Sequence, residues 1–203
     1  MKKTVFATLA LLLFSTAAAE AQYTDLYYPQ SYFKASMGYS NISSDYSDAS
    51  GELKFDSSTL TPIQLGYGVS IGHIAFEGEL AFHFFEFDFN AVDPTFSYMG
   101  DMTAYSLMAN AIYKANPNGA GLYVGGGIGM FSASLDGIED ELRGSAIAVQ
   151  AFAGLDIKVN PQASFFIEGR FMRTLGLDLE NDFAFIDFDL EQMGANVGLR
   201  YYF

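Results

Sequence analysis

The sequence predicts an all-β protein, an eight-stranded, antiparallel, up-and-down transmembrane β-barrel with short periplasmic turns and long extracellular loops. Three observations lead to this prediction. Many segments of the chain alternate between apolar residues and small or polar ones, which is the period of a β-strand. Half of the residues are hydrophobic, yet beyond the N-terminus no segment has the roughly 18 consecutive apolar residues of a membrane helix. Long and short connections alternate between the segments, as they do in membrane barrels.

The alternation is clearest in the last twelve residues, QMGANVGLRYYF, from Gln192 to Phe203. One parity of this stretch is apolar throughout, and the other is mostly small or polar. In a soluble protein, an edge strand of this kind would promote aggregation. It suits a strand that closes a barrel in a bilayer, where every backbone polar group must be paired within the protein.

Eight such segments follow one another along the chain. The connections after the first, third, fifth and seventh are long and rich in acidic residues, beginning with a loop from Asn41 to Leu60. Gly72-His73 is expected to be a tight turn, because glycine tolerates positive φ. Near Phe84-Phe85 the parity slips, which indicates either a bulge or a strand that continues beyond the membrane. The expected strands are 32–40, 61–71, 74–84, 98–113, 121–130, 147–158, 165–171 and 192–203.

The first 21 residues are expected to be a cleaved signal peptide, which leaves 22–203 as one outer-membrane β-barrel domain. Two lysines precede an apolar run from Val5 to Phe14, and Ala19-Glu20-Ala21 has the small-x-small pattern of a cleavage site. The expected localisation is therefore the cell outer membrane. Because the chain has no cysteine, its stability is expected to come from backbone pairing and burial.

The polar parity of the strands distinguishes a membrane barrel from a soluble one. A soluble barrel can carry long Lys and Glu side chains on its water-facing surface, whereas this parity holds mainly Gly, Ser, Ala, Asn and Gln. Small residues fit the lumen of eight strands, which side chains fill. The few charges there should be paired, because an unpaired buried charge is costly. We therefore predict a lumen ion-pair network, centred on Glu168, Arg170 and Arg200, whose members are Lys34, Glu77, Glu79, His83, Asp156, Lys158, Glu168, Arg170 and Arg200.

The layout resembles that of the small eight-stranded bacterial outer-membrane barrels, such as the OmpA transmembrane domain and OmpX, which are grouped with porin-family proteins. The most specific pieces are GLYVGGGIGM at 121–130, AVQAFAGLDIKV at 148–159 and the terminal strand. In that family the terminal strand is read by the assembly machinery. The resemblance therefore implies an assembly signal formed by Val197, Leu199, Tyr201 and Phe203. It also implies a monomer that contacts outer-membrane lipid and lipopolysaccharide, the barrel-assembly machinery and periplasmic chaperones.

The chain is strongly acidic, with a formal net charge of −14. A nucleic-acid partner is not expected, because the phosphates would be repelled. Most of the acids fall in the long loops, where they are expected to form a solvated, self-repelling surface. Clustered carboxylates can also bind Ca²⁺ or Mg²⁺, although no segment has the spacing of an EF-hand. The candidate ligands for such a cation in the third loop are Asp136, Glu139, Asp140 and Glu141.

Neither an enzyme nor a cofactor is expected. Only His73 and His83 could act as imidazole bases, and neither has a serine two residues away, as in the lipid A deacylase barrels. His83 is expected to be a buried structural residue. Two hypotheses about function remain: a structural or surface-interaction barrel that displays acidic extracellular loops, and a narrow porin-like channel for small solutes or ions.

Overall fold

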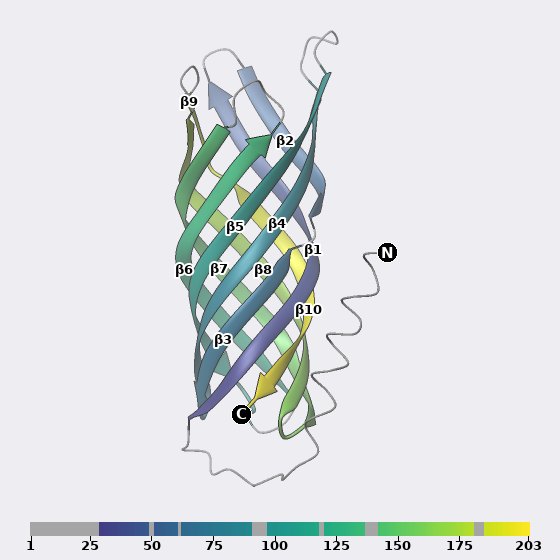
Figure 1. Cartoon of the computed structure of the whole chain (residues 1–203), viewed down its shortest axis with the longest axis vertical. Coiled ribbons are helices and arrows are strands. Elements are labelled where there is room, and N and C mark those ends of the chain that lie inside the picture. Colours follow the sequence, from purple (N-terminus) through teal and green to yellow (C-terminus); the bar gives the residue numbers. More distant parts are fainter. Residues whose placement is uncertain are drawn as a thin grey trace.

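The computed structural model describes residues 29–48, 51–60, 62–90, 97–117, 120–136, 142–180 and 185–203. Within these ranges the regular structure is entirely β, and no helix has the length and apolar composition of a membrane span. All strand pairs are antiparallel, and the pairing of β1 with β10 closes the sheet (Figure 1). The strands are β1 (Gln30–Asp48), β2 (Gly51–Leu60), β3 (Ile63–Ile71), β4 (Ile74–Asn90), β5 (Ser97–Lys114), β6 (Gly121–Asp136), β7 (Leu142–Asn160), β8 (Ala163–Glu180), β9 (Phe185–Phe188) and β10 (Glu191–Tyr202).

These ten strands fill eight positions around the barrel, which confirms the predicted fold. β2 and β3 share one position, since both pair with β1 and β4. β9 and β10 share another, since both pair with β8. Pro62 lies at the break between β2 and β3, where it has no N–H to donate to a sheet ladder. Its carbonyl still accepts a hydrogen bond from Gly38 N at 3.2 Å.

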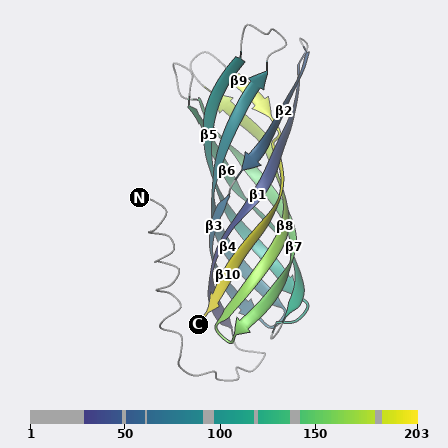
Figure 2. The same ribbon diagram turned by 90° about the vertical axis from the view of Figure 1, so that its right-hand side faces the viewer.

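The two ends of the barrel differ (Figures 1 and 2). The C-terminus and the short turns lie at one end, and extended hairpins rise at the other. Gly72, in the turn between β3 and β4, has a φ of 57°, as its position in a tight turn predicts. The long and short connections thus alternate in space as they do in the sequence.

The connection expected as a loop from Asn41 to Leu60 is instead mostly strand, so that prediction was wrong. β1 continues to Asp48 and pairs with β2 as far as Gly51. In the same way, β6 and β7 extend into the expected third loop. β8 and β9 extend into the fourth, where Leu175, Leu177 and Leu179 keep the alternation of a strand. Backbone hydrogen bonds can hold a hairpin whose residues are polar on both faces, and such a hairpin lacks the alternation that identifies a strand in a sequence.

The parity slip at Phe84-Phe85 is not a bulge against β5. β4 pairs with β5 in one unbroken register from Ile74 to Asn90, so the alternative prediction, a strand that continues, is right. Register shifts occur elsewhere, between β1 and β2 at Ser40/Ile42 and at two points between β7 and β8.

The apolar parity faces outward and the polar parity faces the lumen. Phe76 is 60% exposed on the outer surface, whereas Glu77, its neighbour in β4, is 3% exposed. The residues predicted as an assembly signal lie on the outer face, where Val197, Leu199, Tyr201 and Phe203 are all exposed. Phe203 also completes the barrel seam, because its ring stacks on Phe33 at 5.2 Å and its N–H donates to Ser31 O at 3.0 Å.

Lumen-facing glycines make room for the side chains that fill the barrel. A Cβ on Gly198 would lie 2.5 Å from Ala35 O and 2.5 Å from Ser36 Cβ. We expect Gly198→Val to lower the free energy of unfolding by about 1–3 kcal/mol, the usual cost of overpacking. Urea unfolding of protein refolded into lipid vesicles measures the change.

Gly78→Val is the matched control, since a Cβ on Gly78 meets no atom within 4 Å. The control variant should keep the stability of the natural chain. Equal losses in the two variants would contradict the packing role of Gly198.

Candidate functional site: the lumen ion-pair network

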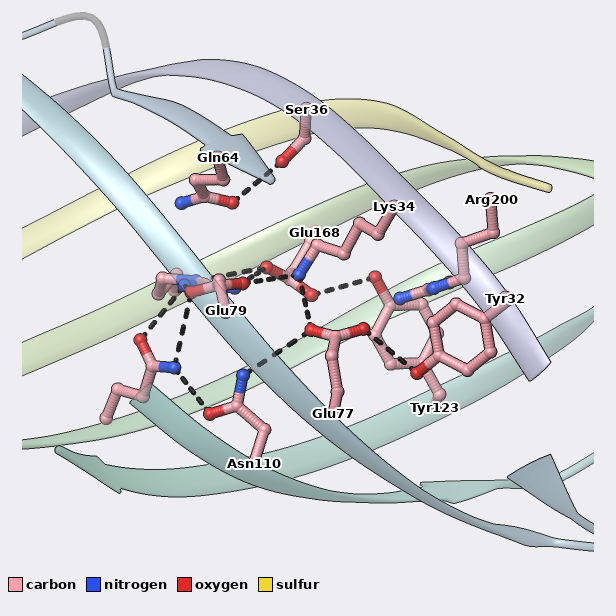
Figure 3. A network of polar contacts seen from close by, with 12 residues as sticks. Tyr32, Lys34, Ser36, Gln64, Glu77, Glu79, Asn110, Tyr123, Glu168 and Arg200 are labelled. Carbon is pink, nitrogen blue, oxygen red and sulfur yellow. Dashed lines mark hydrogen bonds and ion pairs between the residues drawn. The ribbon is translucent and has the colours of Figure 1, made fainter. Parts of the chain in front are cut away.

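Glu79 is at the centre of a buried network of charges in the lumen (Figure 3). Its carboxylate accepts hydrogen bonds from Lys34 Nζ at 2.5 Å and from both terminal nitrogens of Arg170. Lys34 also reaches Glu77, with Nζ 2.9 Å from Oε1, and Arg170 also reaches Glu168, with Nη2 2.8 Å from Oε1. These residues come from β1, β4 and β8, so the ion pairs link separate parts of the barrel wall.

Neutral side chains occupy the remaining hydrogen-bonding positions of this network. The Tyr32 hydroxyl donates to Glu77 Oε2 at 2.9 Å, and the Tyr123 hydroxyl donates to Glu168 Oε2 at 2.9 Å. Gln150 accepts from Arg170 Nη1 at 2.9 Å and donates to Asn110 Oδ1 at 2.6 Å. We did not predict these four residues as members of the network. Their positions on the inward parity of their strands could have identified them as lumen residues.

A second cluster lies nearer the end of the barrel that holds the C-terminus. Arg200 Nη1 donates to Asp156 Oδ2 at 3.0 Å, and the guanidinium lies 4.2 Å from the centroid of the Phe166 ring. Lys114 Nζ donates to the Tyr202 hydroxyl at 3.1 Å.

Arg200 does not pair directly with Glu168, although both were expected at the centre of the network. The register between β10 and β8 places Arg200 opposite Ser164 and places Asn196 opposite Glu168. Glu168 and Arg170 belong to the cluster around Glu79, and Tyr123 connects this cluster to Arg200, since its hydroxyl donates to Glu168 and its ring centroid lies 4.7 Å from the Arg200 guanidinium.

Lys158 and His83 lie at the edges of these clusters. Lys158 is half-buried, with Nζ 5.2 Å from the centroid of the Tyr202 ring. His83 is 2% exposed, with Nε2 3.2 Å from Ser106 Oγ on the neighbouring strand and its ring packed against Phe131. This serine lies on the neighbouring strand, two residues from Ala104, which pairs with His83. The cavity beside the pair has a volume of about 10 Å³, close to what one water molecule needs.

The buried charges in the described part of the lumen balance. Four cations and four carboxylates there are less than 10% exposed. Because moving an ion out of water is costly unless a partner compensates it, a balanced set is the arrangement that allows so many charges inside one barrel. The cations are Lys34, Lys114, Arg170 and Arg200, and the carboxylates are Glu77, Glu79, Asp156 and Glu168.

Two apolar clusters also lie inside the lumen, which we did not predict because their residues share the parity of the polar ones. An aromatic cluster surrounds Arg200 and contains Tyr32, Tyr123, Phe152, Phe166 and Tyr202, together with Ala75 and Ile112. A mainly aliphatic cluster, which we call the aliphatic cluster although it includes the ring of Phe131, is made of Ile42, Ala104, Met108, Phe131, Ala133, Ala146, Ala148, Met172 and Leu190.

The expected cation ligands in the third loop lie mostly outside the described residues. Asp136 is the last residue of β6, and residues 139–141 are not described. Within the described ranges, no three His, Asp or Glu side chains are grouped as a metal site. In the fourth loop, Arg173 Nη2 lies 2.7 Å from Asp189 Oδ2, and this hydrogen bond holds the pKa of Asp189 below its usual value.

Arg170→Gln should destabilise the protein strongly, because Glu79 and Glu168 would each lose a charged partner in the closed lumen. Breaking one side of a buried ion pair typically costs about 3–5 kcal/mol. The measurement is the free energy of unfolding in urea, again in lipid vesicles.

Arg173→Gln provides the control, because its ion pairs with Asp189 and Glu191 are about half exposed. Exposed pairs contribute little, so this variant should unfold like the natural chain. An equal loss of unfolding free energy in Arg173→Gln would mean that the buried ion pairs stabilise the protein no more than the exposed ones.

Comparison with known proteins gives the family. The model of the outer membrane protein beta-barrel domain matches residues 6–203. The fold is similar to that of Neisserial surface protein A, with a TM-score of 0.57 at 16% identity over 85% of this chain and 97% of that one. It is also similar to OprG from Pseudomonas aeruginosa, with a TM-score of 0.57 at 14% identity over 89% and 99%.

No curated protein sequence is similar enough to count as a relative. At these identities the two solved structures establish the fold alone, whereas the family match spans nearly the whole chain. The chain therefore belongs to the outer-membrane β-barrel domain family.

Proposed function

We propose that this protein is a closed barrel of the bacterial outer membrane with a structural and surface-interaction role, and that it is not an open pore. The observation that supports this most directly is the network around Glu79. It joins β1, β4 and β8 through ion pairs whose carboxylates are fully buried. An open water-filled channel would hydrate these charges, whereas here protein groups meet their hydrogen-bonding needs.

The outer surface supports a position within lipid. The large side chains that face outward are apolar or aromatic along most of each strand, as in Leu107 at 60% exposed and Ile128 at 58%. Lipid and lipopolysaccharide are the surroundings that such a surface favours. The outward side chains of Val197, Leu199, Tyr201 and Phe203 would be available to the assembly machinery and to periplasmic chaperones before insertion. We propose that the inserted protein is a monomer.

The extended hairpins support the surface-interaction role. They rise at the end of the barrel opposite the C-terminus (Figure 2), and their sequences carry acids such as Glu52, Asp56, Glu86 and Asp88. If the C-terminal end faces the periplasm, these hairpins project from the cell. An acidic projecting surface favours cationic partners over nucleic acid or other polyanions.

Planar-bilayer conductance tests this function against the alternative of a narrow channel. The refolded natural chain should show no steady openings, because paired charges close the lumen. Removing two members of the network with Glu79→Ser and Arg170→Ser should produce openings, provided that the variant still shifts in mobility on unboiled gels. Reproducible openings of the natural chain would favour the channel.

A further inference from the structure

The lumen on the far side of the Glu79 layer from the C-terminus is lined by the aliphatic cluster, which we call the outer lumen. Every member of this cluster is at most 8% exposed. Four of the members are alanines and two are methionines, Met108 and Met172. The ring of Phe131 is fully buried among them, and methionine side chains adapt readily to a change in what surrounds them.

Leu190 differs from the other members because it does not come from a strand. It lies in the two-residue link between β9 and β10 and is 1% exposed. Two hydrogen bonds to Thr174 hold it, from Leu190 N to Thr174 Oγ1 and from Thr174 N to Leu190 O, both at 2.9 Å. The adjacent Asp189 is held by Arg173 and by Gly176 N. Since the Asp189–Arg173 pair is nearly half exposed, it is a weak restraint on this link.

A small polar cavity continues the outer lumen toward the Glu79 layer, and Met172 lines both. Among the described residues, Gln192 Oε1 and Asn196 Oδ1 on its wall are buried acceptors without a hydrogen-bond partner. Arg170 also lines the cavity, but all three of its guanidinium nitrogens already donate to Glu79, Glu168 or Gln150. The cavity therefore offers unpaired acceptors and little attraction for an anion.

We propose that the outer lumen is a blind binding pocket for a small uncharged molecule that has an apolar body and a hydroxyl donor. Leu190 fills the apolar part of this pocket when no ligand is bound. The ligand would displace Leu190, pack its body between Met108 and Met172, and donate a hydrogen bond to Gln192 or Asn196. The ion pairs around Glu79 form the floor, so the site takes up a ligand without passing it through the barrel. This inference goes beyond the closed-barrel function, which it leaves intact.

Methyl NMR of protein labelled on its methionines tests the proposal in detergent micelles. The probes are benzyl alcohol, toluene and benzoate, which share a ring and differ in the donor and the charge. Met108 and Met172 report on the pocket, whereas Met130 and Met193, at 62% and 71% exposed, report on probe dissolved in the micelle. Benzyl alcohol should shift the two pocket methyls saturably, about tenfold more tightly than toluene, which corresponds to one buried hydrogen bond. Benzoate should bind most weakly.

Two variants assign the effect to named residues. Leu190→Ala should bind benzyl alcohol at least about tenfold more tightly than the natural chain, because the ligand no longer competes with a leucine side chain. Asn196→Leu should lose the preference for benzyl alcohol over toluene. Arg173→Gln, which removes only a weak restraint on the same link, should refold like the natural chain and bind benzyl alcohol at most a few-fold more tightly than it does.

Two outcomes would overturn the proposal. In the first, all four methyls shift in parallel without saturation, which means that the probes only dissolve in the micelle. In the second, Leu190→Ala binds the probe while neither the natural chain nor Arg173→Gln does so up to the solubility of benzyl alcohol. Leu190 would then be a permanent part of the core.

Discussion

The structure depends on the placement of one carboxylate, Glu79, between two cations inside a closed barrel. Eight strands leave a lumen that only side chains can fill, so a buried charge there needs an opposite charge within the protein. Glu79 receives hydrogen bonds from Lys34 and from Arg170, which also bind Glu77 and Glu168. Removing any one of these residues leaves a buried charge with fewer partners. The buried charges therefore depend on one another, and their pairing closes the lumen.

The same pairing constrains the register of the strands. Lys34, Glu79 and Arg170 come from β1, β4 and β8, and they lie 45 and 91 residues apart in pairs. A slip of one residue would turn the charged side chains toward lipid, whereas a slip of two residues would keep them in the lumen but move them about 7 Å away from their partners. The cost of a charge in hydrocarbon opposes the slip of one residue. The network thus selects one register while the alternating pattern alone selects only a face.

Much of the fold could be predicted from the sequence because alternation is a local property. The parity of β10 was enough to assign Arg200 to the lumen and Tyr201 to the outer face, and both assignments hold. Which charges meet is not local, since it depends on how far neighbouring strands are offset. For this reason the sequence predicted that Arg200 and Asp156 both lie in the lumen, but not that they form an ion pair. Leu190 shares the inward parity of β10 and is buried as that parity predicts, but its two hydrogen bonds with Thr174 are not local and could not be predicted.

The two halves of the lumen differ in how easily they can change. Ion pairs in a closed space have few alternative arrangements, because each charge that moves leaves another without a partner. The layer of alanine, methionine, leucine, isoleucine and one phenylalanine has no such requirement, since dispersion contacts are weak singly and not directional. Any conformational change in this barrel should therefore be confined to the outer lumen and the link that carries Leu190. The ion pairs around Glu79 would stay in place beneath it, so a change in the outer lumen would leave the barrel closed.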